Sequence, residues 1–186
     1  MYFETIKCDD YEVFNLEYHL KRVVKTIGKE LNLAEYIYPP SEKLLRCKLV
    51  YNDDEIINVE FFEYKKREIK NFKIVKSDHI DYSKKYLDRS ELEELFLKKE
   101  NSDEVMIFKN GLLTDTSIAN IAIEVENIWY TPKTSLLNGT SRQRHLDNRN
   151  IFEKDIDEEF LKKASRIALM NAMIDFDIIE DYSLSL

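Results

Sequence analysis

Glycine is scarce in this chain, with three residues among 186, and this scarcity excludes the usual nucleotide-binding loops. The G-x-G-x-x-G and Walker motifs both need closely spaced glycines, and neither motif occurs. Gly28 follows an apolar helical pattern and predicts the C-terminal cap of a helix. Asn110-Gly111 predicts a hairpin turn, and Gly139 lies where we expect a helix to begin.

Cysteine and histidine are also rare, with two and three residues. Cys8 and Cys47 lie in strand-like segments without a CxxC spacing, so we expect two buried free thiols and a cytoplasmic protein. His19, His79 and His145 are scattered and lack cysteine companions. A zinc site is therefore not expected, and we predict no metal centre.

The chain also lacks long hydrophobic runs and an excess of positive charge. No apolar run approaches the roughly 20 residues that a membrane span needs, and the N-terminus lacks the basic and apolar regions of a signal peptide. The net charge of −8 disfavours nonspecific binding to nucleic acid, which needs a basic face. With 44% hydrophobic and 34% charged residues, we expect a soluble globular protein without nucleic-acid or membrane partners.

What is present is an alternation of short strands and helices. Strand patterns over residues 2–7, 44–51 and 56–64 and helical patterns over 16–27 and 33–38 predict a small α+β unit at the N-terminus. Beyond it, we expect strands at 72–75, 105–108, 118–123, 128–130 and 166–171, and helices at 89–100, 143–148 and 156–164.

The segment from Gly111 to Arg142 contains the most informative chemistry. Asp115 lies within Thr-Asp-Thr-Ser, which is good turn chemistry, so a turn or N-cap aspartate is one interpretation. The other interpretation is a carboxylate that pairs with a heterocyclic nitrogen. Such a carboxylate keeps a pyridine ring protonated, and the protonated ring accepts electrons from a carbanion.

The turn Gly139-Thr140-Ser141-Arg142 also has two interpretations. It is either a simple helix N-cap or an anion site, where backbone N–H groups at a helix N-terminus and two hydroxyls hold a phosphate. One ligand carries both a basic ring and a phosphate, namely pyridoxal 5′-phosphate. Asp115 and this turn together therefore suggest a site for that cofactor.

Basic residues outside this segment are candidates for the same chemistry. Arg22, in the first helical pattern, could grip a phosphate with two hydrogen bonds, although a surface arginine is the simpler interpretation. Lys84 and Lys85 follow the linker segment expected at residues 77–82, and a partly desolvated lysine can form a Schiff base; a solvated side chain is the alternative. Arg46 is a weak candidate for a substrate carboxylate, or else a strand-edge surface arginine.

Taken in order, these segments resemble the class IV aminotransferase family, the fold-type IV enzymes that use pyridoxal phosphate. The resemblance covers nearly the whole chain. It rests on four motifs of the family, "FET … L..H..R", "K-x-x-[ND]-R", "TE-x-S-x-x-N-[IL]" and "[YL]TP … L-x-GITR". These match Phe3–Thr5 with Asn15–Arg22, Lys85–Arg89, Thr114–Ile121, and Tyr130–Pro132 with Leu137–Arg142.

The resemblance implies a two-domain α/β (α+β) fold like that of D-amino-acid aminotransferase, in a homodimer whose partner closes the site. We expect a small domain over residues 1–75, a linker over 76–84 and a larger cofactor-binding domain over 85–186. The spacing to Arg89 selects Lys85 over Lys84 as the Schiff-base lysine, which forms the internal aldimine and later acts as general base. The implied cofactor-binding residues are Arg22, Asp115, Asn120, Gly139, Thr140 and Ser141.

The chain departs from the family pattern at several points. Asp115 stands in place of the usual glutamate, Thr140 replaces the common isoleucine, and the chain is shorter than most relatives. Residues 170–173, Met-Asn-Ala-Met, are more similar to the "NAL/NSL" segment of aminodeoxychorismate lyases than to the "TGTA" segment of branched-chain aminotransferases. Asn171 is thus a weak candidate for substrate binding, or else it caps the strand end.

These observations leave three functions open, all but the last acting on a small-molecule amine. The first is a lyase that forms 4-aminobenzoate and pyruvate from aminodeoxychorismate. The second is an aminotransferase for a branched-chain or D-amino acid. The third is a short noncatalytic paralogue.

Overall fold

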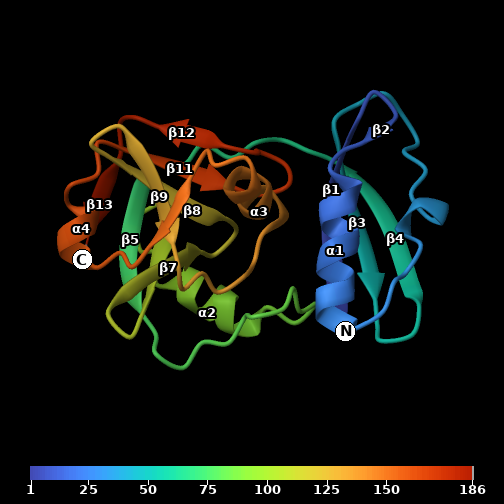
Figure 1. Cartoon of the computed structure of the whole chain (residues 1–186), viewed down its shortest axis with the longest axis horizontal. Coiled ribbons are helices and arrows are strands. Elements are labelled where there is room, and N and C mark those ends of the chain that lie inside the picture. The colour runs from blue at the N-terminus through green and yellow to red at the C-terminus, as the bar shows by residue number, and fades with distance from the viewer. Residues whose placement is uncertain (186) are drawn as a thin grey trace. The chain divides into compact units, whose positions relative to one another are not determined.

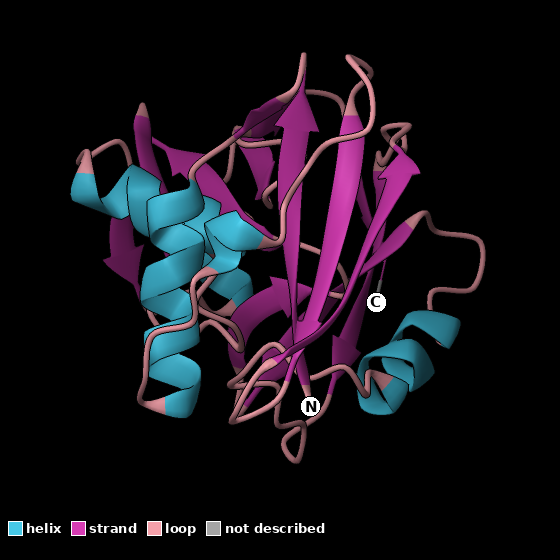
Figure 2. Ribbon diagram, turned by 90° about the vertical axis from the view of Figure 1, so that its right-hand side faces the viewer, coloured by secondary structure: helices cyan, strands magenta, loops and turns pink. Residues whose placement is uncertain are grey.

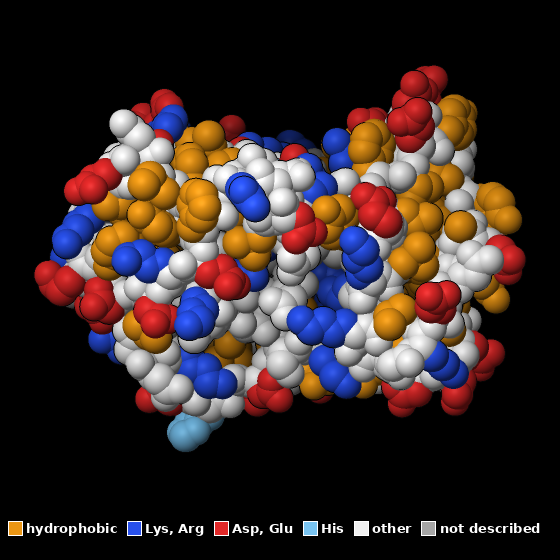
Figure 3. All heavy atoms as spheres, viewed as in Figure 1, with side chains coloured by type: hydrophobic (Ala, Val, Ile, Leu, Met, Phe, Trp, Pro, Cys, Tyr) orange, Lys and Arg blue, Asp and Glu red, His pale blue; other side chains and the backbone are white. Residues whose placement is uncertain are grey.

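The structure, a computed structural model, describes residues 1–185, and these form two compact units (Figure 1). The first unit comprises Met1–Lys66 and Lys84–Asp88, and the second comprises Arg67–Ser83 and the chain from Arg89 onward. Each is a sheet with few helices, as predicted for an α/β (α+β) chain. Figure 3 shows acidic and basic side chains interspersed over the visible face of both units.

The first unit is built on a four-stranded antiparallel sheet with strand order β2-β1-β3-β4. Ile6 and Cys8 of the first strand pack against Val23, so one helix covers one face of this sheet, as Figures 1 and 2 show. The elements are β1 (Tyr2–Asp9), β2 (Glu12–Val13), α1 (Leu16–Ile27), the 3-10 helix η1 (Leu33–Glu35), β3 (Leu45–Tyr51) and β4 (Ile56–Glu63).

The segment that contains Lys85 belongs to this first sheet. The backbone N–H of Phe3 donates to the carbonyl of Lys85 at 3.0 Å, and the N–H of Leu87 donates to the carbonyl of Met1 at 3.1 Å. Tyr2 and Tyr86 form an isolated antiparallel bridge. The lysine backbone is therefore fixed along the first residues of β1.

The second unit contains a nine-stranded mixed sheet in which β10-β9-β8-β7-β6-β5-β13 are successive neighbours, and β11 pairs with both β8 and β12. Its strands are β5 (Asn71–Lys76), β6 (Glu104–Lys109), β7 (Leu112–Thr116), β8 (Asn120–Val125), β9 (Ile128–Pro132), β10 (Phe152–Lys154), β11 (Arg166–Met170), β12 (Asp177–Ile179) and β13 (Ser183–Ser185). Its helices are α2 (Ser90–Leu97), α3 (Thr140–Asp147) and α4 (Glu158–Leu161). The strands β6 and β8 are almost entirely buried and form the centre of its core.

Most predicted elements are present, and the helix over residues 16–27 has the predicted bounds. Gly28 caps it in the left-handed conformation, with φ 76° and its N–H donating to Val24, as predicted. Cys8 and Cys47 are buried free thiols, also as predicted. None of the helices in residues 1–185 is long and apolar enough to cross a membrane. The same residues contain no group of three or more His, Cys, Asp or Glu side chains placed to hold a metal ion.

Several local expectations were wrong. Asp115 lies in β7 rather than in a turn, and the turn follows it at residues 117–119. The expected helices at 33–38, 89–100 and 156–164 are shorter, and β2, β10, β12 and β13 were not predicted. The strand near residues 72–75, which we had expected in the N-terminal domain, pairs with β6 and β13 and so belongs to the second sheet.

Candidate functional site

Asp115 is a buried carboxylate at the end of β7, with 4% of its surface exposed. Its Oδ1 accepts a hydrogen bond from the side-chain amide of Asn120 at 2.7 Å, and its Oδ2 accepts one from the backbone N–H of Leu137 at 3.0 Å. Burial raises the pKa of Asp115 from 3.8 to about 7, against the opposing effect of these donors. A positively charged partner would therefore be strongly attracted to this side chain.

Asn120 joins Asp115 to the turn before α3. Its side-chain amide also donates to the carbonyl of Leu137 at 2.8 Å. Its Oδ1 lies so close to Gly139 that a Cβ built on this glycine would be 1.9 Å away. Gly139 has ordinary extended dihedral angles, φ −68° and ψ 145°, so the close approach of Asn120, rather than backbone strain, requires glycine here.

We expect Gly139→Ala to destabilise the protein by about 1–3 kcal/mol, because Asn120 would have to give up hydrogen bonds to make room for the methyl group. Chemical unfolding in urea measures this change. Asn138→Ala, at the exposed neighbouring position, is the matched control and should have little effect. A Gly139→Ala protein as stable as the wild type would show that Asn120 moves freely.

The N-terminus of α3 follows Gly139 directly, and no side chain caps it. The first N–H groups of an α-helix have no acceptor within the helix, and the helix dipole adds partial positive charge there. Thr140 and Ser141 are buried in this first turn, and the hydroxyl of Ser141 donates to the carbonyl of Asn171 at 2.8 Å. The arrangement offers an anion both N–H donors and hydroxyl groups.

Arg142, the last residue of the same motif, has a different role. Its guanidinium is 2% exposed and donates to the carbonyl of Pro132 at 2.8 Å and to the carboxylate of Glu153 at 2.6 Å. These contacts tie α3 to β9 and β10. Arg142 is thus a structural anchor of the turn.

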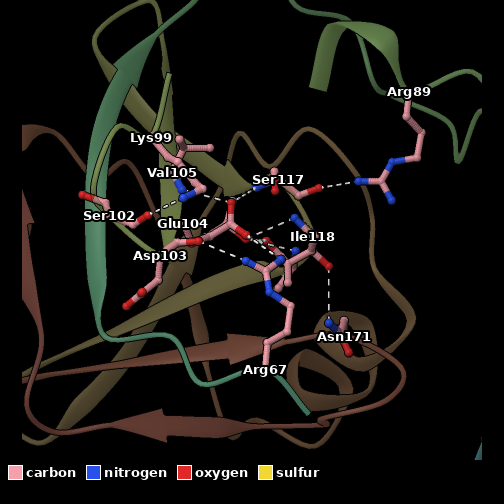
Figure 4. A network of polar contacts seen from close by, with 12 residues as sticks. Arg67, Arg89, Lys99, Ser102, Asp103, Glu104, Val105, Ser117, Ile118 and Asn171 are labelled. Carbon is pink, nitrogen blue, oxygen red and sulfur yellow. Dashed lines mark hydrogen bonds and ion pairs between the residues drawn. The ribbon is translucent and has the colours of Figure 1, made fainter. Parts of the chain in front are cut away.

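The turn between β7 and β8 is held by a polar network shown in Figure 4. The carboxylate of Glu104 accepts hydrogen bonds from the N–H of Val105 at 2.9 Å and of Ser117 at 3.3 Å, and lies 3.6 Å from Arg67. The guanidinium of Arg89 donates to the carbonyl of Ser117 at 2.7 Å. Burial raises the pKa of Glu104, which is fully buried. The peptide of Ser117 is therefore fixed from both sides.

Asn171 connects this turn to α3. Its side-chain amide donates to the carbonyl of Ile118 at 3.3 Å, while its Oδ1 accepts hydrogen bonds from the N–H groups of Met173 and Ile174. These contacts are those of a residue that closes a strand end. Glu104 was not predicted from the sequence, although a carboxylate at the start of the apolar segment Val105–Phe108 was an available signal.

In the first unit, Arg22 is held by Glu4. The Nε of Arg22 donates to Glu4 Oε1 at 2.9 Å and its Nη2 donates to Glu4 Oε2. The Nδ1 of His19 lies 2.5 Å from the same Oε2. Arg22 is therefore part of a partly buried ion cluster. Both partners belong to the motif that contains Arg22, but their contacts with it were not predicted from the sequence.

Lys84 and Lys85 lie over neighbouring side chains of β1. The Nζ of Lys84 is 5.5 Å from the centre of the Tyr2 ring, and that of Lys85 is 4.6 Å from the centre of the Phe3 ring. The two ammonium groups therefore contact different rings of β1. The two lysines thus differ in their surroundings, whereas in the sequence only the spacing to Arg89 distinguished them.

Arg46 is an exposed residue of β3, with its guanidinium 5.1 Å from the centre of the Phe62 ring. It lies opposite Lys7 in the register of β1 and β3. Lys7 is four residues from Phe3 on β1, so Arg46 shares a sheet face with the ring that Lys85 contacts.

The second unit thus joins Asp115, Asn120, Ser141 and Asn171 through hydrogen bonds, with Gly139 and Thr140 between them along the chain. The first unit contains Arg22, Arg46 and Lys85. The residues selected from separate segments therefore fall into two groups, one in each unit.

Comparisons with known proteins identify the family of the chain. The family model described as amino-transferase class IV matches residues 84–179. An uncharacterized protein of Haemophilus influenzae is 36% identical over 182 residues, which are 92% of this chain and 96% of that protein. The chain belongs to the class IV aminotransferase family, whose members are pyridoxal-phosphate-dependent enzymes.

Solved structures show the same fold. A Haemophilus somnus 129pt protein, named as a proposed 4-amino-4-deoxychorismate lyase, has a TM-score of 0.86 and 35% identity over 92% of this chain and 95% of that one. A hypothetical aminotransferase of Mycobacterium tuberculosis, in a pyridoxal-phosphate-bound form, has a TM-score of 0.81 with 14% identity, over 99% of this chain and 81% of that one. The chain therefore has the fold-type IV architecture that its motifs predicted.

Proposed function

We propose that this protein is a pyridoxal-phosphate-dependent enzyme whose first candidate activity is that of a 4-amino-4-deoxychorismate lyase. The observation that carries the proposal is the hydrogen-bonded cluster of the second unit. In it, the buried carboxylate of Asp115 is hydrogen-bonded to Asn120 and to Leu137. Asn120 is also bonded to Leu137, which lies two residues before Gly139, the N-cap of α3. Such a site suits a ligand with a basic ring at one end and a phosphate at the other.

The residues present fit this cofactor. Asp115 is buried with a raised pKa, and a protonated pyridine nitrogen would supply the cation that such a carboxylate needs. The helix N-terminus with Thr140 and Ser141 would hold the phosphate. In the first unit, Arg22 is our further candidate for binding it. The bound cofactor supplies a pyridinium ring that withdraws electrons from the substrate Cα.

Lys85 carries the amine to which we assign covalent attachment of the cofactor. The Nζ of Lys85 would also move the proton at the substrate Cα as a general base. Asp115 would hold the proton on the ring nitrogen of a bound cofactor, and the Glu104–Ser117 contact keeps the turn after Asp115 in place. Arg46 is our candidate for binding a substrate carboxylate.

The lyase is preferred because a relative with 35% identity is named for that proposed activity and because residues 170–173 resemble the lyase segment. The alternative is an aminotransferase for a branched-chain or D-amino acid, which the fold equally accommodates. A noncatalytic short paralogue is the third possibility. We also propose a homodimer whose partner closes the site, and a cytoplasmic location, which the two free thiols favour.

Two measurements test the proposal. The purified protein, supplied with pyridoxal phosphate, should develop a visible absorbance band, and borohydride should then fix the cofactor to a lysine detectable by peptide mass. Failure to take up the cofactor would remove the enzymatic proposal. Light scattering would test the dimer.

A second assay separates the two reactions. Incubation with aminodeoxychorismate should yield 4-aminobenzoate and pyruvate. Formation of a keto acid from an L- or D-amino acid, with no 4-aminobenzoate, would select the aminotransferase instead. With whichever substrate reacts, Arg46→Gln should raise KM and leave kcat nearly unchanged; an unaltered KM would remove Arg46 from the substrate site.

A further inference from the structure

Three ionisable side chains lie together beneath α1, in the first unit. Glu4 is fully buried, His19 is 1% exposed, and the side chain of Arg22 is 10% exposed. His19 and Arg22 are three residues apart on the helix, so both lie on the face that covers β1. The carboxylate of Glu4 points at this face and contacts both of them.

Glu4 is ionised within this cluster. Burial opposes its charge, but the nearby Arg22 cation and the contact with His19 outweigh burial and lower the pKa of Glu4 to about 2. Burial lowers the pKa of His19, which favours its neutral form. The cluster then consists of one anion, one cation and a neutral imidazole, held by three polar contacts.

A buried ion pair has a high desolvation penalty, and apolar side chains of similar size often attach a helix to a sheet equally well. The neighbouring contacts of α1 are of that apolar kind, made by Val23 with Ile6 and Cys8. The polar cluster thus calls for an explanation other than stability. The geometry of the Arg22 guanidinium supplies one.

A guanidinium has five N–H donors in a rigid plane. Glu4 occupies the edge formed by Nε and Nη2, so the donors of Nη1 point away from it. We propose that Glu4 and His19 are positioning residues, which fix the Arg22 guanidinium so that its Nη1 side receives the phosphate of the cofactor. This inference rests on the proposed function and adds two residues that act through Arg22.

The proposal and simple electrostatics predict effects of opposite sign. Glu4 is an anion next to the arginine that would bind a phosphate dianion. If only charge mattered, its removal would strengthen phosphate binding. If Glu4 orients Arg22, Glu4→Gln weakens phosphate binding, because glutamine keeps one acceptor and turns an amide N–H₂ toward the donors of Arg22 and His19.

The experiment compares two ligands, pyridoxal phosphate and pyridoxal without phosphate, in titrations of the full-length protein followed by absorbance. Glu4→Gln should weaken the binding of pyridoxal phosphate by about tenfold, the effect expected for one misplaced charge-assisted hydrogen bond. The affinity for pyridoxal should change little. Glu63→Gln, which removes an exposed carboxylate of the same sheet that pairs with Lys43, should alter neither affinity.

His19 provides an independent variant should Glu4→Gln fail to fold. His19→Leu removes the contact with Glu4 and should also weaken pyridoxal phosphate selectively. His19→Asn places an amide nitrogen near the position of Nδ1 and should restore the affinity. Finally, Glu4→Gln should have no further effect in an Arg22→Gln background, because both act through the same contact.

Several outcomes would overturn the inference. Equal weakening of both ligands would indicate general damage to the unit. Unchanged or tighter binding of pyridoxal phosphate in Glu4→Gln would show that Arg22 needs no orientation. If the wild-type protein binds the cofactor but the variants show no selectivity, only this inference fails; if the wild type binds none, the proposed function fails with it.

Discussion

Lys85→Ala should lose the visible absorbance band of the cofactor-treated protein and should turn over substrate at least about 10³-fold more slowly than the wild type. The reason is that Nζ of this residue is assigned two tasks, covalent attachment and proton transfer at the substrate Cα, and general base catalysis alone contributes about 10²–10⁴-fold. Absorbance spectra, borohydride trapping with peptide mapping, and product formation measure the effect.

Lys84→Ala is the matched control for this variant. Lys84 is adjacent in sequence and has the same side chain, but its Nζ lies over the ring of Tyr2 whereas that of Lys85 lies over the ring of Phe3. The control should keep both the band and the activity. A cofactor adduct found on Lys84, or turnover in Lys85→Ala close to that of the wild type, would contradict the assignment.

Elements with local determinants could be predicted from the sequence, whereas those that depend on distant partners could not. The helix over residues 16–27 has an apolar period of helical type and a glycine cap, and both act within the segment itself. The strand β13 has only three residues, and its parallel pairing joins Ser183 to Asn71. No pattern within residues 183–185 could indicate that partner.

The local sequence around Asp115 favours a turn, but the residue lies in a strand. Thr-Asp-Thr-Ser is a good turn sequence, but the pairing of Met106 with Thr116 and of Phe108 with Leu113 extends β7 as far as Thr116. Tertiary pairing thus overrode the local preference. The aspartate is buried at the end of a strand, which gives it the raised pKa that a turn aspartate in solvent would lack.

The candidate site could be predicted as a set of residues but not as a set of contacts. The motifs selected Arg22, Asp115 and Asn120, whereas the bonds of Glu4 to Arg22 and of Glu104 to Ser117 join residues 18 and 13 positions apart. Such pairs become visible only when the strands and helices are placed. The contacts determine how the selected residues are held, which the sequence motifs leave unspecified.

Raising the pH from about 4 to about 8 should destabilise the cofactor-free wild-type protein relative to Asp115→Asn. Burial raises the pKa of Asp115 from 3.8 to about 7, so between these values the native state binds a proton that the unfolded state has lost. Stability then falls as the pH rises through this window, and the full difference is on the order of 4 kcal/mol. Below the window both states are protonated, and Asp115 contributes nothing.

Urea unfolding of both proteins across this pH range measures the effect, and the variant cancels the contributions of all other groups. Parallel pH profiles would show that Asp115 is already ionised in the native protein without a ligand. A bound pyridinium would favour the carboxylate and lower its pKa, so saturation with pyridoxal phosphate should remove most of the wild-type slope. The burial that destabilises the free protein near neutral pH is therefore the feature that makes Asp115 a strong partner for a protonated ring.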